Sequence, residues 1–152
     1  MSEPTKTRIL VIDDDESIRK VLKTILEDEG YVVDTAENGR EAIRKSNENF
    51  YNLALIDIKL PDMEGTKLLT SMKETTPPMV KIILTGFPTM QNAIEAVNKG
   101  ADGYVTKPIE DIDALLGKIK ELLKKQEEQK KFNEAKVAEF VESRAKELGY
   151  LP

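Results

Sequence analysis

Five short apolar runs divide the chain, and the segments between them are long enough to hold a helix each. The runs are rich in Val, Ile and Leu, which is typical of β-strands. The first, third and fourth are almost continuously apolar, which favours strands buried on both faces of a parallel sheet. The second and fifth are more mixed, which favours places toward the sheet edges. The runs are RILVID (8–13), YVVDTA (31–36), NLALID (52–57), VKIILT (80–85) and DGYVT (102–106).

The segments between the runs show helical spacing. In the first, apolar residues recur at steps of three and four, and Gly30 follows as a stop signal. The strand–helix unit therefore repeats five times. This order predicts an α/β fold with a doubly wound, five-stranded parallel sheet whose ligands bind at the carboxyl ends of the strands. The other predicted helices cover Asn38–Asn47, Thr66–Lys73, Met90–Lys99 and a stretch that begins at the N-cap Asp111.

The end of the chain differs from the strand–helix units because it contains no further strand-like apolar run. Lys124–Lys136 has few apolar residues and charges of alternating sign, which is typical of a solvated helix or a linker. Further on, Val137, Phe140, Val141 and Leu148 resume helical spacing and predict a short amphipathic helix. The domain's own surface, a second copy of the chain or a different partner would have to cover that stripe. We therefore divide the chain into a domain of residues 1–124 and a charged helical extension of residues 125–152.

The length, the net charge and the missing residue types limit which ligands the chain can bind. A length of 152 residues suits one domain with an appendage, and a net charge of -5 disfavours direct binding to nucleic acid. The chain has neither Cys nor His, so any metal site must use oxygen ligands, which favour magnesium, calcium or manganese. The polar start and the lack of an apolar run of about 18 residues lead us to expect a cytoplasmic protein without a membrane partner.

Acidic residues gather where two of the predicted strands end. Asp13, Asp14 and Asp15 follow the first strand, and helix capping explains only one of the three. Asp57 ends the third strand, so a parallel sheet brings it to the same edge. Carboxylates that converge within a few Å repel one another unless a cation lies among them. The sequence therefore predicts a site for a hard divalent cation.

A hydroxyl and an ammonium reach the same edge of the sheet. The fourth strand ends in Thr85 and Gly86, and the fifth leads to Thr106, Lys107 and Pro108. Each residue alone has an ordinary explanation as a strand end, a surface lysine or a turn. Their joint placement beside the acids indicates a functional site.

This combination resembles the receiver domain of two-component response regulators of the chemotaxis-regulator type. The resemblance covers Arg8 to about Lys124 and implies a flavodoxin-like fold. It is carried by the acidic pair Asp13 and Asp14, by Asp57 within DIKLPDMEG, by Thr85-Gly86, and by Lys107-Pro108 within GADGYVTKP.

The resemblance implies a role for each residue of the metal site. Asp57 would accept a phosphoryl group. Asp14 and Asp57 would bind Mg²⁺, with Mn²⁺ as an alternative, and the backbone carbonyl of Lys59 would be a third ligand. Asp13 would act largely through water.

It also implies the residues that respond to phosphorylation. Lys107 would contact a phosphoryl oxygen, and the Lys107-Pro108 bond would be cis, as in the family. Thr85 would be drawn toward the phosphoryl group, and the switching aromatic Tyr104 would turn inward. Phe87 has two readings: it either screens the acyl phosphate from water or packs locally.

The function implied is a signalling switch that changes its protein-binding surface, and not an enzyme in the usual sense, because the chain would catalyse only its own phosphorylation and dephosphorylation. The donor would be a partner histidine kinase or phosphotransfer protein, since the chain lacks histidine. A downstream protein target and a homodimer through the last helix and the extension are further expected partners. The kinase, the signal, the target, and whether the chain is part of a longer regulator stay open.

Three other functions fit less well. A Mg²⁺-dependent phosphatase or phosphotransferase could also use an aspartyl phosphate, but Lys59 stands where enzymes of the haloacid dehalogenase type carry a second acid. A nucleotide or flavin binder is disfavoured because DDDES replaces a glycine-rich loop after the first strand. A degenerate receiver that serves as a scaffold is disfavoured by the intact acidic set.

Overall fold

The computed structural model describes residues 6–152, so the polar residues 1–5 lie outside the described part. All five predicted strand–helix units are present. In chain order they are β1 (Arg8–Ile12), α1 (Glu16–Asp28), β2 (Val32–Ala36), α2 (Gly39–Glu48), β3 (Leu53–Asp57), α3 (Gly65–Ser71), β4 (Val80–Thr85), α4 (Met90–Asn98), β5 (Gly103–Thr106) and α5 (Ile112–Glu147).

The five strands form one parallel sheet in the order β2-β1-β3-β4-β5. The mixed strands β2 and β5 are the edges, as their composition predicted. Ile12 of β1 is level with Ile56 of β3, and Thr85 of β4 is level with Thr106 of β5. This register brings the residues that follow the strands to one edge of the sheet, which confirms the convergence expected from the sequence.

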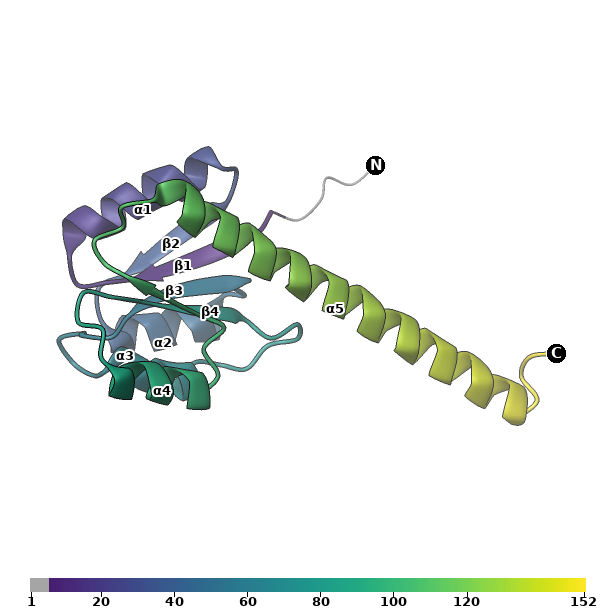
Figure 1. Cartoon of the computed structure of the whole chain (residues 1–152). Helices are drawn as coiled ribbons and strands as arrows, with labels where there is room; N and C mark the ends of the chain where they lie inside the picture. The colour runs from purple at the N-terminus through teal and green to yellow at the C-terminus, as the bar shows by residue number, and fades with distance from the viewer. Residues whose placement is uncertain (1–5) are drawn as a thin grey trace.

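Helices cover both faces of the sheet. α1 and α5 lie on one face, and α2, α3 and α4 lie on the other (Figure 1). Because the central strands are covered on both sides, their residues are buried without alternation, and β3 is buried along its whole length. Asp57 is therefore held at the end of a rigid strand.

Local signals explain where the helices begin and end. Asp15 is the N-cap of α1 and accepts hydrogen bonds from the amides of Ser17 and Ile18. Asp111 caps α5 in the same way, as predicted. Gly30 ends α1 with a φ of 96°, a conformation that glycine adopts without strain.

The last helix is continuous through both halves of the extension. α5 runs for 36 residues and projects well beyond the sheet (Figure 1). Gln126 fixes it to the domain by donating to the carbonyls of Asn52 (2.9 Å) and Pro78 (2.8 Å). Beyond that point, Phe140 is 68% exposed and Val141 is 58% exposed. The domain's own surface therefore does not cover the apolar stripe.

Long as α5 is, no helix within residues 6–152 has the apolar length that crossing a membrane requires.

Candidate functional site

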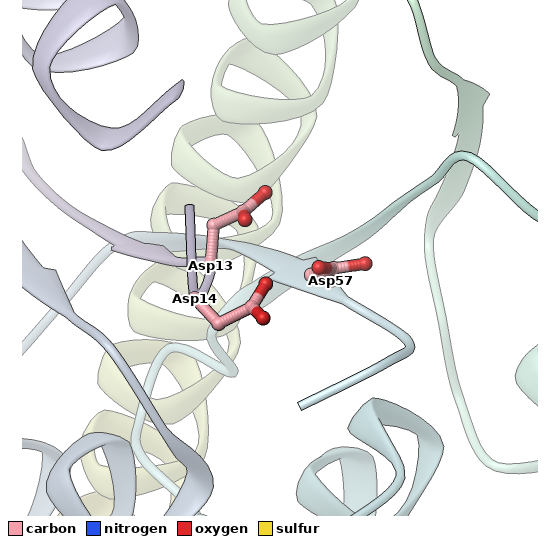
Figure 2. Close-up of side chains that lie close together, drawn as sticks. All are labelled: Asp13, Asp14 and Asp57. Atoms are coloured by element: carbon pink, nitrogen blue, oxygen red, sulfur yellow. The ribbon is translucent and has the colours of Figure 1, made fainter. Parts of the chain in front are cut away.

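Three carboxylates meet at the ends of β1 and β3. Asp13, Asp14 and Asp57 each offer an oxygen, and these oxygens all lie within 4.8 Å of one another (Figure 2). Asp13 and Asp57 are buried, whereas Asp14 is exposed. Asp15, the third acid of the run, is used as a helix cap. The pair that the sequence singled out is thus the pair that reaches the site.

Lys107 brings an ammonium into this cluster from the end of β5. Its Nζ lies 2.5 Å from Oδ2 of Asp13 and 3.4 Å from Oδ2 of Asp57. Burial alone would lower the pKa of Lys107, but the two carboxylates outweigh it and raise that pKa, so the ammonium stays charged. The Lys107-Pro108 peptide bond is cis, as expected.

The negative charge exceeds what one lysine can balance. Burial raises the pKa of Asp57, and the neighbouring Asp13 raises it further, while Lys107 opposes both effects. Three carboxylates and one ammonium leave an excess of two negative charges when all are ionised. A hard divalent cation would balance that charge, and carboxylate oxygens are the ligands that Mg²⁺ prefers. The residues present therefore fit Mg²⁺.

Asp13 is held more firmly than its neighbours. Its Oδ1 accepts a hydrogen bond from the amide of Asp15 (2.9 Å), and its Oδ2 accepts from Lys107. Its backbone carbonyl accepts from Nη1 of Arg19 (2.6 Å). Both carboxylate oxygens of Asp13 are thus already engaged by protein donors, which distinguishes it from the exposed Asp14.

Thr85 and Tyr104 lie on neighbouring strands behind the acids. Thr85 is fully buried, and its Oγ1 accepts a hydrogen bond from the amide of Phe87 (3.0 Å). The ring of Tyr104 packs against the apolar cluster of the α2–α4 face. Its hydroxyl is buried and has no hydrogen-bond partner within residues 6–152. Tyr104 is therefore already packed inward in this structure.

Lys59 and Phe87 border the site from two different loops. The amide of Lys59 lies 3.4 Å from Oδ1 of Asp57, and its Nζ lies 5.6 Å from the centre of the Phe87 ring. Phe87 is 63% exposed, so it does not pack into the domain. This cation–π pair was not predicted, because nothing in the spacing of residues 28 positions apart signals it.

The loop after Asp57 depends on a glycine. The amide of Gly65 donates to the carbonyl of Ile58 (2.6 Å), and a Cβ added at Gly65 would collide with the carbonyl oxygen of Asp57. Asp62, which sequence reasoning did not single out, lies in the same loop and accepts from the amides of Gly39 and Arg40. Its partners are more than 20 residues away, so no local pattern could have indicated this contact.

The chain resembles known proteins over most of its length. The family model described as "Response regulator receiver domain" matches residues 9–120. The transcriptional regulatory protein ResD of Bacillus subtilis is 35% identical over 133 residues, which are 88% of this chain and 55% of ResD. The virulence transcriptional regulatory protein PhoP of Salmonella typhimurium is 34% identical over 118 residues, which are 78% of this chain and 52% of PhoP. The chain thus spans about half the length of these relatives.

Solved structures show the same fold. A CheY-like receiver domain protein from Methanospirillum hungatei is 46% identical, with a TM-score of 0.78 over 82% of this chain and 99% of the other. The response regulator TrrA from Thermotoga maritima, solved in complex with Mg(2+)-BeF, is 36% identical, with a TM-score of 0.68 over 76% of this chain and 98% of the other. The chain belongs to the response regulator receiver domain family, whose members are two-component signalling switches controlled by phosphorylation of an aspartate.

Proposed function

We propose that Asp57 is the phosphoacceptor of this switch. The observation that carries the proposal is the position of its carboxylate, which ends the buried strand β3, lies 3.4 Å from the Lys107 ammonium and is within 4.8 Å of the carboxylates of Asp13 and Asp14. Rigid placement matters because an anionic nucleophile must approach an anionic phosphoryl group, so catalysis rests on positioning and on balancing charge.

Asp14 and Asp57 would hold Mg²⁺ directly, and the backbone carbonyl of Lys59 would complete the protein ligands. The engagement of both Asp13 oxygens by Lys107 and Asp15 supports a role for Asp13 through water. The bound Mg²⁺, or Mn²⁺ in its place, would neutralise charge on the phosphoryl oxygens. The exposure of Asp14 supports access of the ion from solvent.

The transfer itself uses residues of this chain. Response regulators receive their phosphoryl group from histidine kinases, and the donor histidine would lie outside these 152 residues, which contain none. A carboxylate oxygen of Asp57 bonds to phosphorus while the bond from phosphorus to the donor's imidazole nitrogen breaks. The leaving imidazole takes a proton from solvent. Lys107 then pairs with a phosphoryl oxygen, and the chain thus catalyses its own modification.

The signal would pass through Thr85 and Tyr104. The hydroxyl of Thr85 now accepts from the amide of Phe87, which leaves its proton free to be donated to a phosphoryl oxygen. A buried hydroxyl without a partner costs about 1–3 kcal/mol, so the present position of Tyr104 is a costly one. That cost supports a second, outward position for the ring in the unphosphorylated chain. Movement of Thr85 toward a phosphoryl group would favour the inward position and change the surface formed by β5 and α5 that a downstream protein target reads.

The domain of residues 1–124 would then be the switch, and residues 125–152 would be a dimerisation helix. The exposed stripe of Val137, Phe140 and Val141 supports self-association. Sedimentation equilibrium should give a dimer for the unmodified chain and a monomer for Phe140→Glu. A chain that stays monomeric up to high concentration would contradict the dimer and leave the switch untouched.

Incubation with Mg²⁺ and acetyl phosphate, followed by intact mass measurement, tests the proposed switch. The chain should gain one phosphoryl group, and Asp57→Asn should gain none. A lack of any gain at saturating donor, or an equal gain in the variant, would reject Asp57 as the acceptor.

A further inference from the structure

The loop between β3 and α3 is a small closed hairpin. At its base, the amide of Gly65 donates to the carbonyl of Ile58 (2.6 Å), and Lys59 pairs with Glu64 in an antiparallel bridge. The hairpin contains Lys59, whose carbonyl is the proposed third metal ligand. A closed base fixes one end of this segment and leaves the position of its tip to other contacts.

The tip is docked on the N-terminus of α2. Oδ1 of Asp62 accepts from the amide of Gly39 (2.8 Å), and Oδ2 accepts from the amide of Arg40 (2.9 Å). These two amides are among the four that a helix leaves unpaired at its start, and the positive end of the helix dipole favours a carboxylate there. Both carboxylate oxygens of Asp62 thus accept hydrogen bonds from α2, which belongs to another strand–helix unit than the hairpin.

Packing reinforces the same contact. Met63 lies against Gly39, and a Cβ added at Gly39 would collide with the sulfur of Met63. Gly39 is buried, although it stands at the first position of its helix. The Met63 side chain at the hairpin tip thus occupies the space that any side chain at position 39 would need.

We propose that Asp62 is a positioning residue for the metal site. By docking the hairpin tip on α2, it holds the Lys59 backbone at the place where its carbonyl can meet the ion held by Asp14 and Asp57. The inference rests on the proposed function, because it assumes that the acidic cluster holds the ion. Supporting contacts around metal ligands commonly change metal affinity by about 10- to 100-fold when they are removed.

Isothermal titration with Mg²⁺ tests this role on the full chain. Asp62→Ala should raise the Kd for Mg²⁺ by about 10-fold. Asp62→Asn keeps one acceptor oxygen and should fall between Asp62→Ala and the unmodified chain. Asn38→Ala is the matched control, because Asn38 caps the same helix by accepting from the amide of Glu41 (2.8 Å) and makes no hydrogen bond to the hairpin. Its Kd for Mg²⁺ should not change.

Thermal denaturation without Mg²⁺ separates positioning from stability. Asp62→Ala and Asn38→Ala each remove a cap from α2, so both should lower Tm, while only the first should weaken Mg²⁺ binding. An unchanged Kd in Asp62→Ala, or an equal loss in Asn38→Ala, would overturn the positioning role and leave the proposed function standing. Equal losses in Asp62→Asn and Asp62→Ala would assign the effect to charge and also overturn it. An unmodified chain that binds no Mg²⁺ would overturn both proposals.

Discussion

Replacing Asp57 by Asn should stabilise the metal-free fold. At an effective dielectric of 20, two unit charges no more than 4.8 Å apart repel by at least about 3.5 kcal/mol, and Lys107, 3.4 Å from Asp57, attracts it by about 5 kcal/mol. Asp13 and Asp14 both repel Asp57, and water weakens the share of the exposed Asp14. Burial adds a further cost to the ionised Asp57. Removal of its charge should therefore raise the free energy of unfolding by about 1–2 kcal/mol.

Thermal denaturation at pH 7 with a chelator measures this change. For a chain of this size, a gain of about 1–2 kcal/mol corresponds to a rise in Tm of about 2–8 °C. Saturating Mg²⁺ should reverse the order, because at about 100 times its Kd a ligand that binds only the folded state adds about 2.7 kcal/mol. The unmodified chain should gain this stability, and Asp57→Asn should gain much less.

The pH dependence gives a second reading of the same effect. The pKa of Asp57 is raised in the folded state, so its protonation favours folding, and this contribution is lost as pH rises through the folded value. The advantage of Asp57→Asn should therefore shrink as pH falls toward about 3.9, the ordinary pKa of Asp. An advantage that is independent of pH would contradict the electrostatic explanation.

Asp34 provides a control of opposite sign. Burial acts to raise its pKa, but hydrogen bonds from Tyr51 (2.6 Å) and Arg8 (3.0 Å) outweigh this effect and lower it. Its contribution to stability is present above its ordinary pKa and is lost as pH falls through the folded value. Asp34→Asn should lower Tm at pH 7. If Asp57→Asn also lowers Tm, the attraction of Lys107 outweighs the repulsion, and our account of the site's charge is wrong.

Three further changes test single contacts. Lys107→Met leaves the buried Asp13 without its cation, so it should lower the free energy of unfolding in urea by about 3 kcal/mol and should make phosphorylation slower. An unchanged denaturation midpoint would show that the ion pair adds nothing to stability. Gly65→Ala should cost about 1–3 kcal/mol and weaken Mg²⁺ binding, because its Cβ meets the Asp57 carbonyl; normal stability would mean that the loop yields freely. Phe87→Ala should shorten the half-life of the phosphorylated chain by exposing the acyl phosphate to water, and an equal or longer half-life would reject screening by Phe87.

The strands and the strand-end residues were predictable because the physics is local or topological. Continuous apolar runs predict strands covered on both faces, and parallel strands necessarily bring their carboxyl ends to one edge. The sequence therefore predicts that Asp13, Asp57 and Lys107 lie together, and the distances between them confirm it. The register of β4 with β5 places Thr85 at the same edge of the sheet.

The course of α5 could not be decided from apolar spacing. The segment after Lys124 has almost no apolar periodicity, so helix and linker were equally acceptable. The structure continues the helix with charged pairs one turn apart, such as Lys125 with Glu121 (3.4 Å) and Lys146 with Glu142 (3.3 Å). Pairs of this kind stabilise a helix without any core.

The loops around the site were the least predictable part. Lys59 meets Phe87, and Asp62 meets the start of α2, through side-chain directions that depend on the folded positions of separate units. The inward packing of Tyr104 is of the same kind, because a strand pattern does not specify a rotamer. Such contacts form only once the separate units have folded together, so no local pattern in the sequence indicates them.

The most direct test of the central claim is to locate the phosphoryl group on the chain. After reaction with acetyl phosphate and Mg²⁺, borohydride reduces an acyl phosphate on aspartate to the alcohol homoserine, and peptide mass spectrometry then identifies the changed position. Our account predicts homoserine at position 57 alone, and none after the same treatment without the phosphodonor. Reduction at Asp13 or Asp14, or at no aspartate of a phosphorylated chain, would contradict it.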